Sequence, residues 1–86
     1  MNDNIFQNEP QITVTRYRQH LLYKVQGVKK RPLRFDLIDL SGAKVRTIDL
    51  LYGDEFVVPV GNLNPGEYLY MLSTTLGMLK TGICHI

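Results

Sequence analysis

Few residues in this chain could take part in covalent chemistry. Cys84 and His85 are adjacent near the C-terminus, and His20 is the other histidine. A thiol beside an imidazole could act as a nucleophile with its base, because the thiolate is the reactive form. Adjacent residues of a strand point to opposite faces, however, and the sequence shows no third group to orient the imidazole. We therefore expect no catalytic pair, and a protein that is not an enzyme.

Metal and phosphate sites are equally hard to build from this composition. A structural zinc site takes four ligands in paired spacing, whereas the chain has one cysteine and two distant histidines. Asp36 and Asp39 lie three residues apart in an expected strand, which places their carboxylates on opposite faces. No glycine-rich loop joins a strand to a helix to hold phosphate groups. The sequence predicts no metal site and no cofactor.

One stretch of the chain is strongly basic. Residues 16 to 34 include seven basic side chains and no acidic one, although the formal net charge is only +2. The seven are Arg16, Arg18, Lys24, Lys29, Lys30, Arg31 and Arg34. Acidic residues gather between residues 36 and 55, so the charges could pair across the fold. The alternatives are a solvated basic face, or a patch for an anionic partner such as lipopolysaccharide or nucleic acid.

Two tyrosines within the basic stretch suggest nucleic acid as one candidate for the anionic partner. Tyr17 and Tyr23 lie among the basic residues, as in proteins that stack single-stranded bases on aromatic rings. Tyrosine also favours strands, where its ring packs inward and its hydroxyl reaches the surface. Because no ribonucleoprotein motif accompanies the pair, nucleic acid is not the partner we expect.

The elements expected to position these residues are all strands. With 86 residues the chain predicts one domain over residues 11–86, after a polar flexible arm or linker remnant over residues 1–10. Extended segments, most with a period of two, lie around residues 12–15, 21–26, 33–37, 44–50, 56–60, 68–72 and 78–86. No window carries a helix pattern with caps. The prediction is an all-β fold: a small antiparallel immunoglobulin-like β-sandwich of about seven short strands.

Three local features make sharper predictions. Ile12 and Val14 alternate with threonines, which predicts a first strand with one buried face. Pro59 lacks an N–H for a ladder, so its strand should lie at an edge or pair on one side there. Residues 64–67 (NPGE) fit the type II turn of a hairpin, with proline fixing the first φ and glycine accepting a positive second φ.

No targeting segment is recognisable at the N-terminus. Residues 1–10 lack the basic start and the apolar stretch of a signal peptide. The apolar runs are far shorter than the ~20 residues of a spanning helix, so we expect no membrane insertion. Either the protein is cytoplasmic, if Met1 is the true start, or it is the tail of a longer protein exported through the periplasm to the cell surface. One cysteine leaves the compartment open.

Two motifs and a final strand occur in an order that is found in a known family. Residues 35–45 (FDLIDLSGAKV) are an aliphatic strand that runs into Asp-Leu-x-Gly and a valine. Residues 58–70 (VPVGNLNPGEYLY) are a strand followed by Leu, a proline-glycine pair, one residue and Tyr, and residues 80–86 carry a lysine among aliphatic residues. Over about residues 21–86 the chain therefore resembles the C-terminal sorting domain of type IX secretion cargo in Bacteroidetes.

The resemblance implies a seven-stranded antiparallel sandwich that serves as an address label. The outer-membrane translocon would recognise the folded sandwich and its C-terminal strand. A sortase-like peptidase at the cell surface would then remove the label and attach the cargo to anionic lipopolysaccharide, so catalysis would belong to the peptidase. In this chain the motif residues would be Asp39, Gly42, Pro65, Gly66 and Tyr68, which hold the sandwich, and Lys80, exposed in the last strand.

Two other interpretations keep the same fold. A fibronectin type III domain also places Leu-x-Pro-Gly before a tyrosine, at a corner where the ring packs and the hydroxyl bonds to backbone. Part of the match could therefore reflect turns and core positions that unrelated β-sandwiches also need. The chain could also be an adhesive module that binds carbohydrate or another protein along an edge strand.

Overall fold

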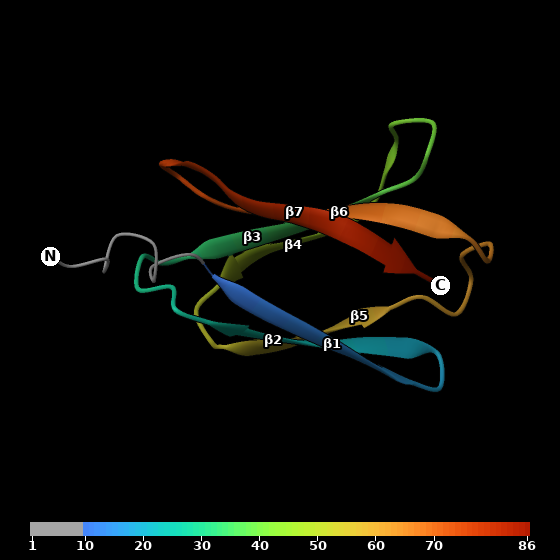
Figure 1. The fold of residues 1–86 in the computed structure, drawn as a ribbon, viewed down its shortest axis with the longest axis horizontal. Helices are drawn as coiled ribbons and strands as arrows, with labels where there is room; N and C mark the ends of the chain where they lie inside the picture. The colour runs from blue at the N-terminus through green and yellow to red at the C-terminus, as the bar shows by residue number, and fades with distance from the viewer. Residues whose placement is uncertain (1–9) are drawn as a thin grey trace, which may run out of the picture.

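Two antiparallel sheets pack face to face in the computed structural model, which describes residues 10–86 (Figure 1). The strands are β1 (Gln11–Tyr17), β2 (His20–Gln26), β3 (Leu33–Ile38), β4 (Lys44–Leu51), β5 (Glu55–Pro59), β6 (Glu67–Thr74) and β7 (Gly77–His85). One sheet has the order β1-β2-β5 and the other β4-β3-β6-β7. The predicted all-β sandwich of about seven strands is confirmed. The arm expected over residues 1–10 lies, apart from Pro10, outside the described residues.

Three of the six connections are hairpins and three cross between the sheets. β1–β2, β3–β4 and β6–β7 are hairpins within a sheet, whereas the other three connections pass from one sheet to the other. β4 pairs with β3 and not with β5. Variable immunoglobulin domains likewise add their extra strands to the edge of one sheet. The segment at residues 64–67 therefore belongs to a crossing between β5 and β6, and the expected hairpin there is wrong.

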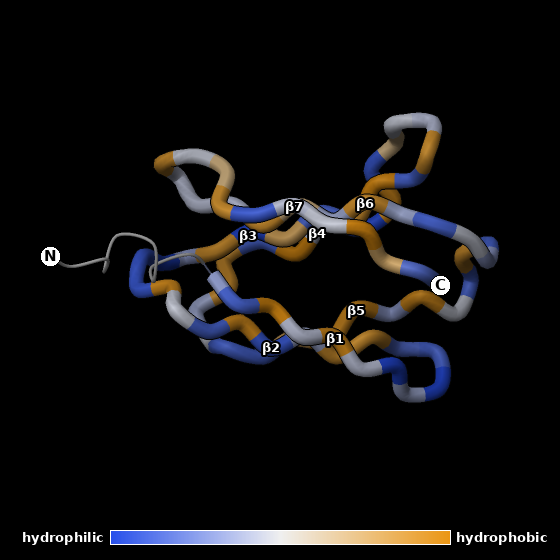
Figure 2. Tube along the Cα trace, in the orientation of Figure 1, coloured by the Kyte–Doolittle hydropathy of each residue, from blue (hydrophilic) through white to orange (hydrophobic). Residues whose placement is uncertain are grey.

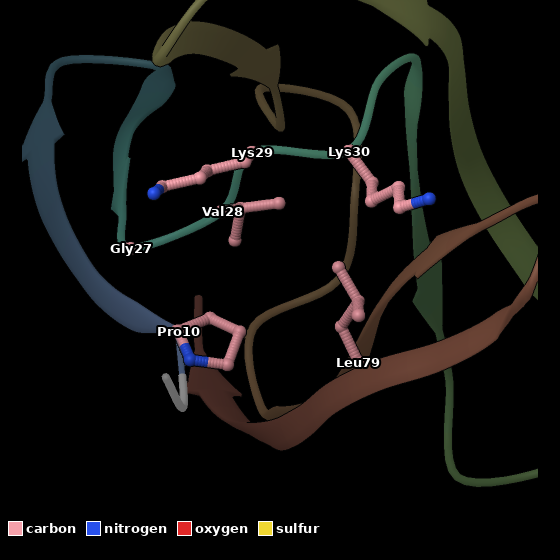
Figure 3. Close-up of a pocket in the computed structure, with 6 residues that line it drawn as sticks. All are labelled: Pro10, Gly27, Val28, Lys29, Lys30 and Leu79. Atoms are coloured by element: carbon pink, nitrogen blue, oxygen red, sulfur yellow. The ribbon is translucent and has the colours of Figure 1, made fainter. Parts of the chain in front are cut away.

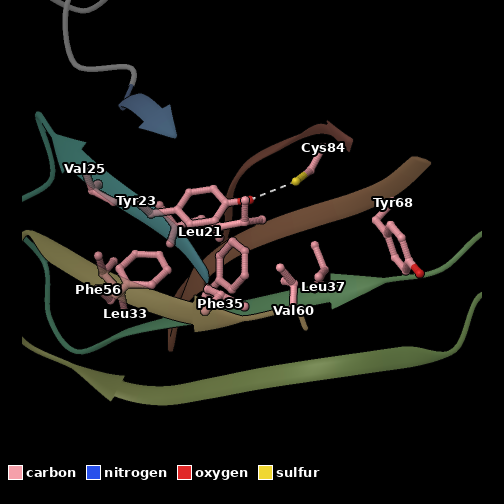
Figure 4. Packing of buried hydrophobic residues seen from close by; sticks show 12 residues of the cluster. Leu21, Tyr23, Val25, Leu33, Phe35, Leu37, Phe56, Val60, Tyr68 and Cys84 are labelled. Carbon is pink, nitrogen blue, oxygen red and sulfur yellow. Dashed lines mark hydrogen bonds between the residues drawn. The ribbon is translucent and has the colours of Figure 1, made fainter. Parts of the chain in front are cut away.

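An aromatic cluster fills the space between the sheets (Figure 4). The Tyr23 ring centroid lies 4.7 Å from that of Phe35 and 5.3 Å from that of Phe56. Figure 2 shows apolar and hydrophilic segments following one another along the strands, and the buried positions of β2, β3 and β5 include these three rings. Burying each of these rings stabilises the fold by roughly 1.5–3 kcal/mol.

The Tyr23 hydroxyl is buried and needs a partner there. It donates a hydrogen bond to Cys84 Sγ at 3.3 Å, so one side chain on β2 is tied to β7 of the other sheet (Figure 4). Burial raises the pKa of Tyr23 far above its ordinary value, and the hydrogen bond to Cys84 adds to the shift. The hydroxyl therefore stays protonated and remains a donor.

Asp36 is a buried carboxylate on the outward face of β3, where the side chain is almost fully covered at 3% exposure. Thr47 Oγ1 donates to it at 2.7 Å, Arg34 Nε lies 3.2 Å away, and Lys44 Nζ lies 3.9 Å away. A buried charge needs such partners, because desolvation would otherwise cost several kcal/mol. Asp36 is thus a structural group that joins β3 to β4.

The connection before β6 contains a turn, but not at the predicted residues. The Leu63 N–H donates to the Val60 carbonyl at 3.1 Å, which places the hydrogen-bonded turn at residues 60–63. Gly66 has a φ of 144°, well away from the value near +80° of a type II turn. Its N–H and carbonyl both bond to Ile86, at 3.1 and 2.9 Å. The predicted type II turn is wrong because Gly66 continues the β6–β7 ladder to the chain end.

Tyr68 forms the corner that fibronectin-like sandwiches use. Its ring is buried at the start of β6, and its hydroxyl donates to the Asn64 carbonyl at 2.6 Å. The bond spans four residues and holds the crossing segment against the core. The corner that Leu-x-Pro-Gly before a tyrosine indicated is therefore present at Tyr68.

β4 contains a residue with an uncommon backbone. Leu33 pairs with Leu51 and Phe35 pairs with Ile48, so two residues of β4 oppose one residue of β3 in a bulge. The second of these, Leu50, has a φ of 58°, and its N–H bonds to Asp49 Oδ1 at 2.9 Å. A side chain with a Cβ resists this conformation.

Replacing Leu50 by glycine should therefore stabilise the protein. The leucine side chain is 66% exposed, so little apolar burial is lost, and glycine relieves the positive φ. We expect Leu50→Gly to raise the free energy of unfolding in urea by about 1 kcal/mol. Leu76→Gly is the matched control, because Leu76 is 75% exposed and has no positive φ. A loss of stability for Leu50→Gly as large as for Leu76→Gly would contradict the assignment of strain.

Candidate functional site

The residues with reactive side chains are not assembled into a reactive site. Cys84 is buried in the core, whereas His85 points outward, where its Nε2 lies 3.7 Å from Glu67 Oε2. The thiol and the imidazole therefore point to opposite faces of β7, as predicted from strand geometry. Within residues 10–86, no three His, Cys, Asp or Glu side chains are grouped so that they could hold a metal ion. Over the same residues, no helix is long and apolar enough to span a bilayer.

A cavity of about 330 Å³ opens at one end of the sandwich. Its lining residues are Pro10, Gly27, Val28, Lys29, Lys30 and Leu79 (Figure 3). Pro10, Val28 and Leu79 form an apolar hollow, and the two lysine side chains extend away from one another on opposite sides of it. The two ammonium groups therefore do not converge on one anion.

The basic stretch does not form one continuous patch. Lys24 Nζ lies 3.7 Å from Glu55 Oε2, Arg31 bonds to Asp54, and Arg34 is shared between Asp36 and Asp49. The charges thus pair across the fold, which was one of the alternatives from the sequence.

The remaining basic residues of the stretch lie at two separate ends. Arg16 lies near the end of β1 and Arg18 lies in the β1–β2 turn. Arg18 has a positive φ of 56°, and its guanidinium lies 5.5 Å from the Tyr17 ring centroid. Lys29 and Lys30 lie beyond the other end of β2. An extended anion such as a nucleic acid would therefore meet two small groups of charges separated by the length of a strand.

The first motif from the sequence shapes a hairpin. Asp39 Oδ1 accepts hydrogen bonds from the Ser41 N–H at 2.9 Å, the Ser41 hydroxyl at 2.6 Å and the Ala43 N–H at 3.0 Å. The bond from the Ser41 hydroxyl, followed by that from the Ala43 backbone, holds the pKa of Asp39 below its ordinary value. Gly42 has a φ of 92° with open space around it, so its role is conformational.

The second motif lies at the same end of the molecule. Pro65, Gly66 and Tyr68 lie before and at the start of β6, near the C-terminus and the β3–β4 turn (Figure 1). Lys80 lies further back along β7, in register with the buried Leu72, and is only partly exposed. The structure brings five of the six motif residues to one end, and Lys80 lies apart from them on an inward-facing position of β7.

Four strand edges decide where another chain could pair with the described sandwich, and two of them are protected. On either side of β5, the Asp54 carbonyl accepts from the Val25 N–H of β2 and the Val60 N–H donates to the Gln19 carbonyl just before β2. Pro59 therefore turns its missing N–H to the outer side, as predicted from the sequence. Arg46 on β4 crosses to this edge, where its Nε donates to the Pro59 carbonyl at 2.8 Å. The bulge at residues 49–50 interrupts the edge of β4. Proline, a charged side chain and a bulge are the devices that block pairing with other chains.

The edge of β7 carries no such protection over its last five residues. Gly66 and Ile86 exchange both of their backbone hydrogen bonds, and bonded pairs alternate along an antiparallel ladder. Gly82 and Cys84 therefore bond to β6, whereas the N–H and carbonyl groups of Thr81, Ile83 and His85 point away from it. In the described chain no strand pairs with this side of β7.

β1 and β7 bound an opening on the same side of the sandwich. Arg46 joins the β4 and β5 edges, so the other two edges, β1 and β7, lie on the opposite side. Val14 pairs with the buried Tyr23 and shares its inward face, yet 47% of Val14 is exposed. The predicted buried face of β1 is thus only partly covered, because no described strand lies over it.

The outward face of β7 also continues an apolar row. Ile38, Leu69 and Ile83 lie in register across β3, β6 and β7, and Ile83 at the edge is 61% exposed. Val14, Thr81 and Ile83 were not selected from the sequence. The contrast between Pro59 in β5 and the proline-free β7 was the signal that could have indicated the unprotected edge.

Comparisons with known proteins assign no family. No family model matches the chain, and no curated protein or solved structure is significantly similar to it. The site is therefore defined by geometry: the outward backbone groups of Thr81, Ile83 and His85, with Val14 and Ile83 on its two faces. We call this site the β7 edge.

Hydrogen exchange should alternate along β7. We expect the amides of Thr81, Ile83 and His85 to exchange at least about tenfold faster than those of Gly82 and Cys84, because only the latter bond to β6. Residue-resolved NMR exchange of the full chain measures this. Leu69 and Met71 in the central strand β6 are the control and should both be protected. Equal protection along β7 would mean that its edge is covered.

Gly82 should be required for the shape of β7. A Cβ at this position would lie 2.5 Å from Tyr70 Cε2, whose ring packs against Phe35 with centroids 6.1 Å apart. We expect Gly82→Ala to lower the free energy of unfolding by about 1–3 kcal/mol through overpacking. Gly53→Ala is the control, since its Cβ would meet no atom closer than 3.8 Å. Equal urea midpoints for the two variants would show that Tyr70 moves aside without cost.

Proposed function

We propose that this chain is a non-enzymatic C-terminal sorting domain, which directs a cargo protein through the type IX translocon to the cell surface of a Bacteroidetes bacterium. The order of the two motifs and of the last strand in the sequence supports the proposal. The β7 edge is the main structural support for the proposal, because it presents unpaired backbone groups on the last strand with which another protein could pair.

The arrangement suits an address label in physical terms. The motif residues Asp39, Gly42, Gly66 and Tyr68 act within the chain, where they hold turns, a corner and the end of the ladder. They make the last strand a fixed template, and the translocon supplies the partner strand. Removal of the label and attachment of cargo to anionic lipopolysaccharide are the work of the sortase-like peptidase, with no catalytic residue from this chain.

The adhesive alternative uses the same edge with a different partner. A module that binds another protein would also pair through β7, whereas carbohydrate recognition would call for polar side chains around a hollow. The hollow at Pro10, Val28 and Leu79 is apolar, whereas a second hollow of about 340 Å³ beside the β4 bulge has Arg34, Asp49 and Ser73 in its lining, and a glycan would bind there and not at the β7 edge.

A secretion assay tests the proposal. The full chain is fused behind a signal peptide and a reporter in a type IX-competent bacterium, and surface and periplasmic reporter are measured separately. We expect the reporter to reach the surface with the natural chain and with Thr81→Val. Thr81→Pro should leave it in the periplasm, because it removes an outward N–H while the bonds to β6 remain.

The outcomes separate the two functions. Reporter retained in the periplasm by the natural chain would overturn the sorting proposal and leave adhesion as the better interpretation. Surface delivery that is equal for Thr81→Pro and Thr81→Val would show that the β7 edge is not what the translocon reads.

A further inference from the structure

The hollow beside the β4 bulge combines charged, hydroxyl and apolar side chains. Its volume is about 340 Å³, at the lower end of the range of about 300–1,000 Å³ for small-molecule sites. The lining includes Pro32, Arg34, Asp49, Leu50, Ser73 and Thr75. These residues come from β3, β4 and β6 and from the segments just before β3 and just after β6. Three neighbouring strands therefore place one guanidinium, one carboxylate and hydroxyl groups around one small space.

The bulge brings two successive side chains of β4 to this hollow. Asp49 and Leu50 lie together opposite Arg34 of β3. Adjacent residues of a regular strand point to opposite faces, yet both of these residues line the same hollow. Leu50 does so with a φ of 58°, which strains a residue that has a Cβ. Bulges that re-aim a side chain, and strained backbone, are concentrated at functional sites. A role of Leu50 in the hollow accounts for the strain.

The charged groups of the hollow are held in place and balance one another. Arg34 Nε lies 3.2 Å from the buried carboxylate of Asp36, which fixes the guanidinium. Arg34 Nη1 lies 3.9 Å from Asp49 Oδ2, which is too far for a direct hydrogen bond. A hydroxyl group joins such a pair, because it accepts from the guanidinium and donates to the carboxylate. With Lys44, which lies 3.9 Å from Asp36, these four residues carry no net charge, so a neutral ligand fits best.

We propose that the hollow beside the β4 bulge binds a neutral pyranose sugar. One sugar hydroxyl bridges Arg34 and Asp49, and others bond to the hydroxyls of Ser73, which is in register with Arg34, and Thr75. The C–H face of the ring packs against Leu50. A sugar carries donors and acceptors at its rim and apolar C–H groups on its faces, which is the mixture that this lining complements. The inference does not depend on the sorting function, because none of these residues belongs to the β7 edge.

An NMR titration of the full chain labelled with 15N tests the site. The neutral probes are the methyl glycosides of glucose, galactose and mannose. We expect at least one of them to bind with a dissociation constant of about 1 mM and to shift the amide signals of Arg34, Leu50, Ser73 and Thr75. The uronic acid and the 2-amino derivative of the bound sugar should bind at least about tenfold more weakly, because the balanced lining does not compensate their charge.

Leu50→Gly separates loss of binding from loss of folding. It removes the apolar contact and relieves the positive φ, so the sugar should bind about tenfold more weakly while the urea midpoint rises. Leu40→Gly is the matched control, since Leu40 is 76% exposed in the β3–β4 turn and does not line the hollow. It should leave binding within about twofold. A variant that is more stable and yet binds more weakly has not lost the sugar through misfolding.

Asp49→Asn tests the bridging hydroxyl. Asparagine keeps the oxygen that accepts from the Leu50 N–H at 2.9 Å, but it replaces the second carboxylate oxygen by a donor. We expect the sugar to bind about tenfold more weakly. Glu67→Gln removes the same charge at the start of β6, six residues from Ser73, and should leave binding within about twofold.

Each contrary result overturns the inference. No shift with any of the three sugars at about 10 mM, shifts confined to another face, charged derivatives that bind as tightly as the neutral sugar, or unchanged binding by both Leu50→Gly and Asp49→Asn would each do so. Secretion is a separate readout. Secretion without sugar binding would overturn this inference alone, and sugar binding without secretion would overturn the sorting function alone.

Discussion

Backbone N–H and C=O groups need hydrogen-bond partners, and this requirement governs the structure. A sandwich built from two open sheets ends in four strand edges, and each edge leaves such groups without a partner in its own sheet. On one side, Pro59, the bulge at residues 49–50 and the bond from Arg46 to the Pro59 carbonyl make the edges poor templates. On the other side β7 keeps a regular register with β6 over its last residues, and its outer side is open to pairing. This asymmetry is what gives a protein with little side-chain chemistry a candidate site.

The core and the open edge depend on the same few contacts. Tyr23 lies at the centre of the aromatic cluster and bonds across the sandwich to Cys84 of β7. Gly66 and Ile86 close the last rung of the β6–β7 ladder, and the Tyr68 corner holds the segment just before it. An edge strand fixed at one end by the ladder and through its middle by the core loses little conformational entropy when a partner pairs with it.

The parts of the fold that were predictable from sequence are those encoded locally. Period-two alternation in β2 predicts that Tyr23 is buried, and the missing N–H of Pro59 predicts an edge. The type II turn at residues 64–67 was wrong because Gly66 bonds to Ile86, twenty residues later in the chain. Val14 was expected to be covered, since alternation shows which residues share a face but not whether another strand lies over it.

The sequence by itself determined the class of fold, the turn at Asp39 and Gly42, the corner at Tyr68, and the separation of Cys84 from His85 on opposite faces of a strand. Each follows from the conformational preferences of a few neighbouring residues. Only the tertiary structure decided that the basic stretch is divided by ion pairs with Asp54, Glu55 and Asp49, and that β1 and β7 bound an open side. Those outcomes depend on which strands become neighbours, a choice set by the packing of two whole sheets.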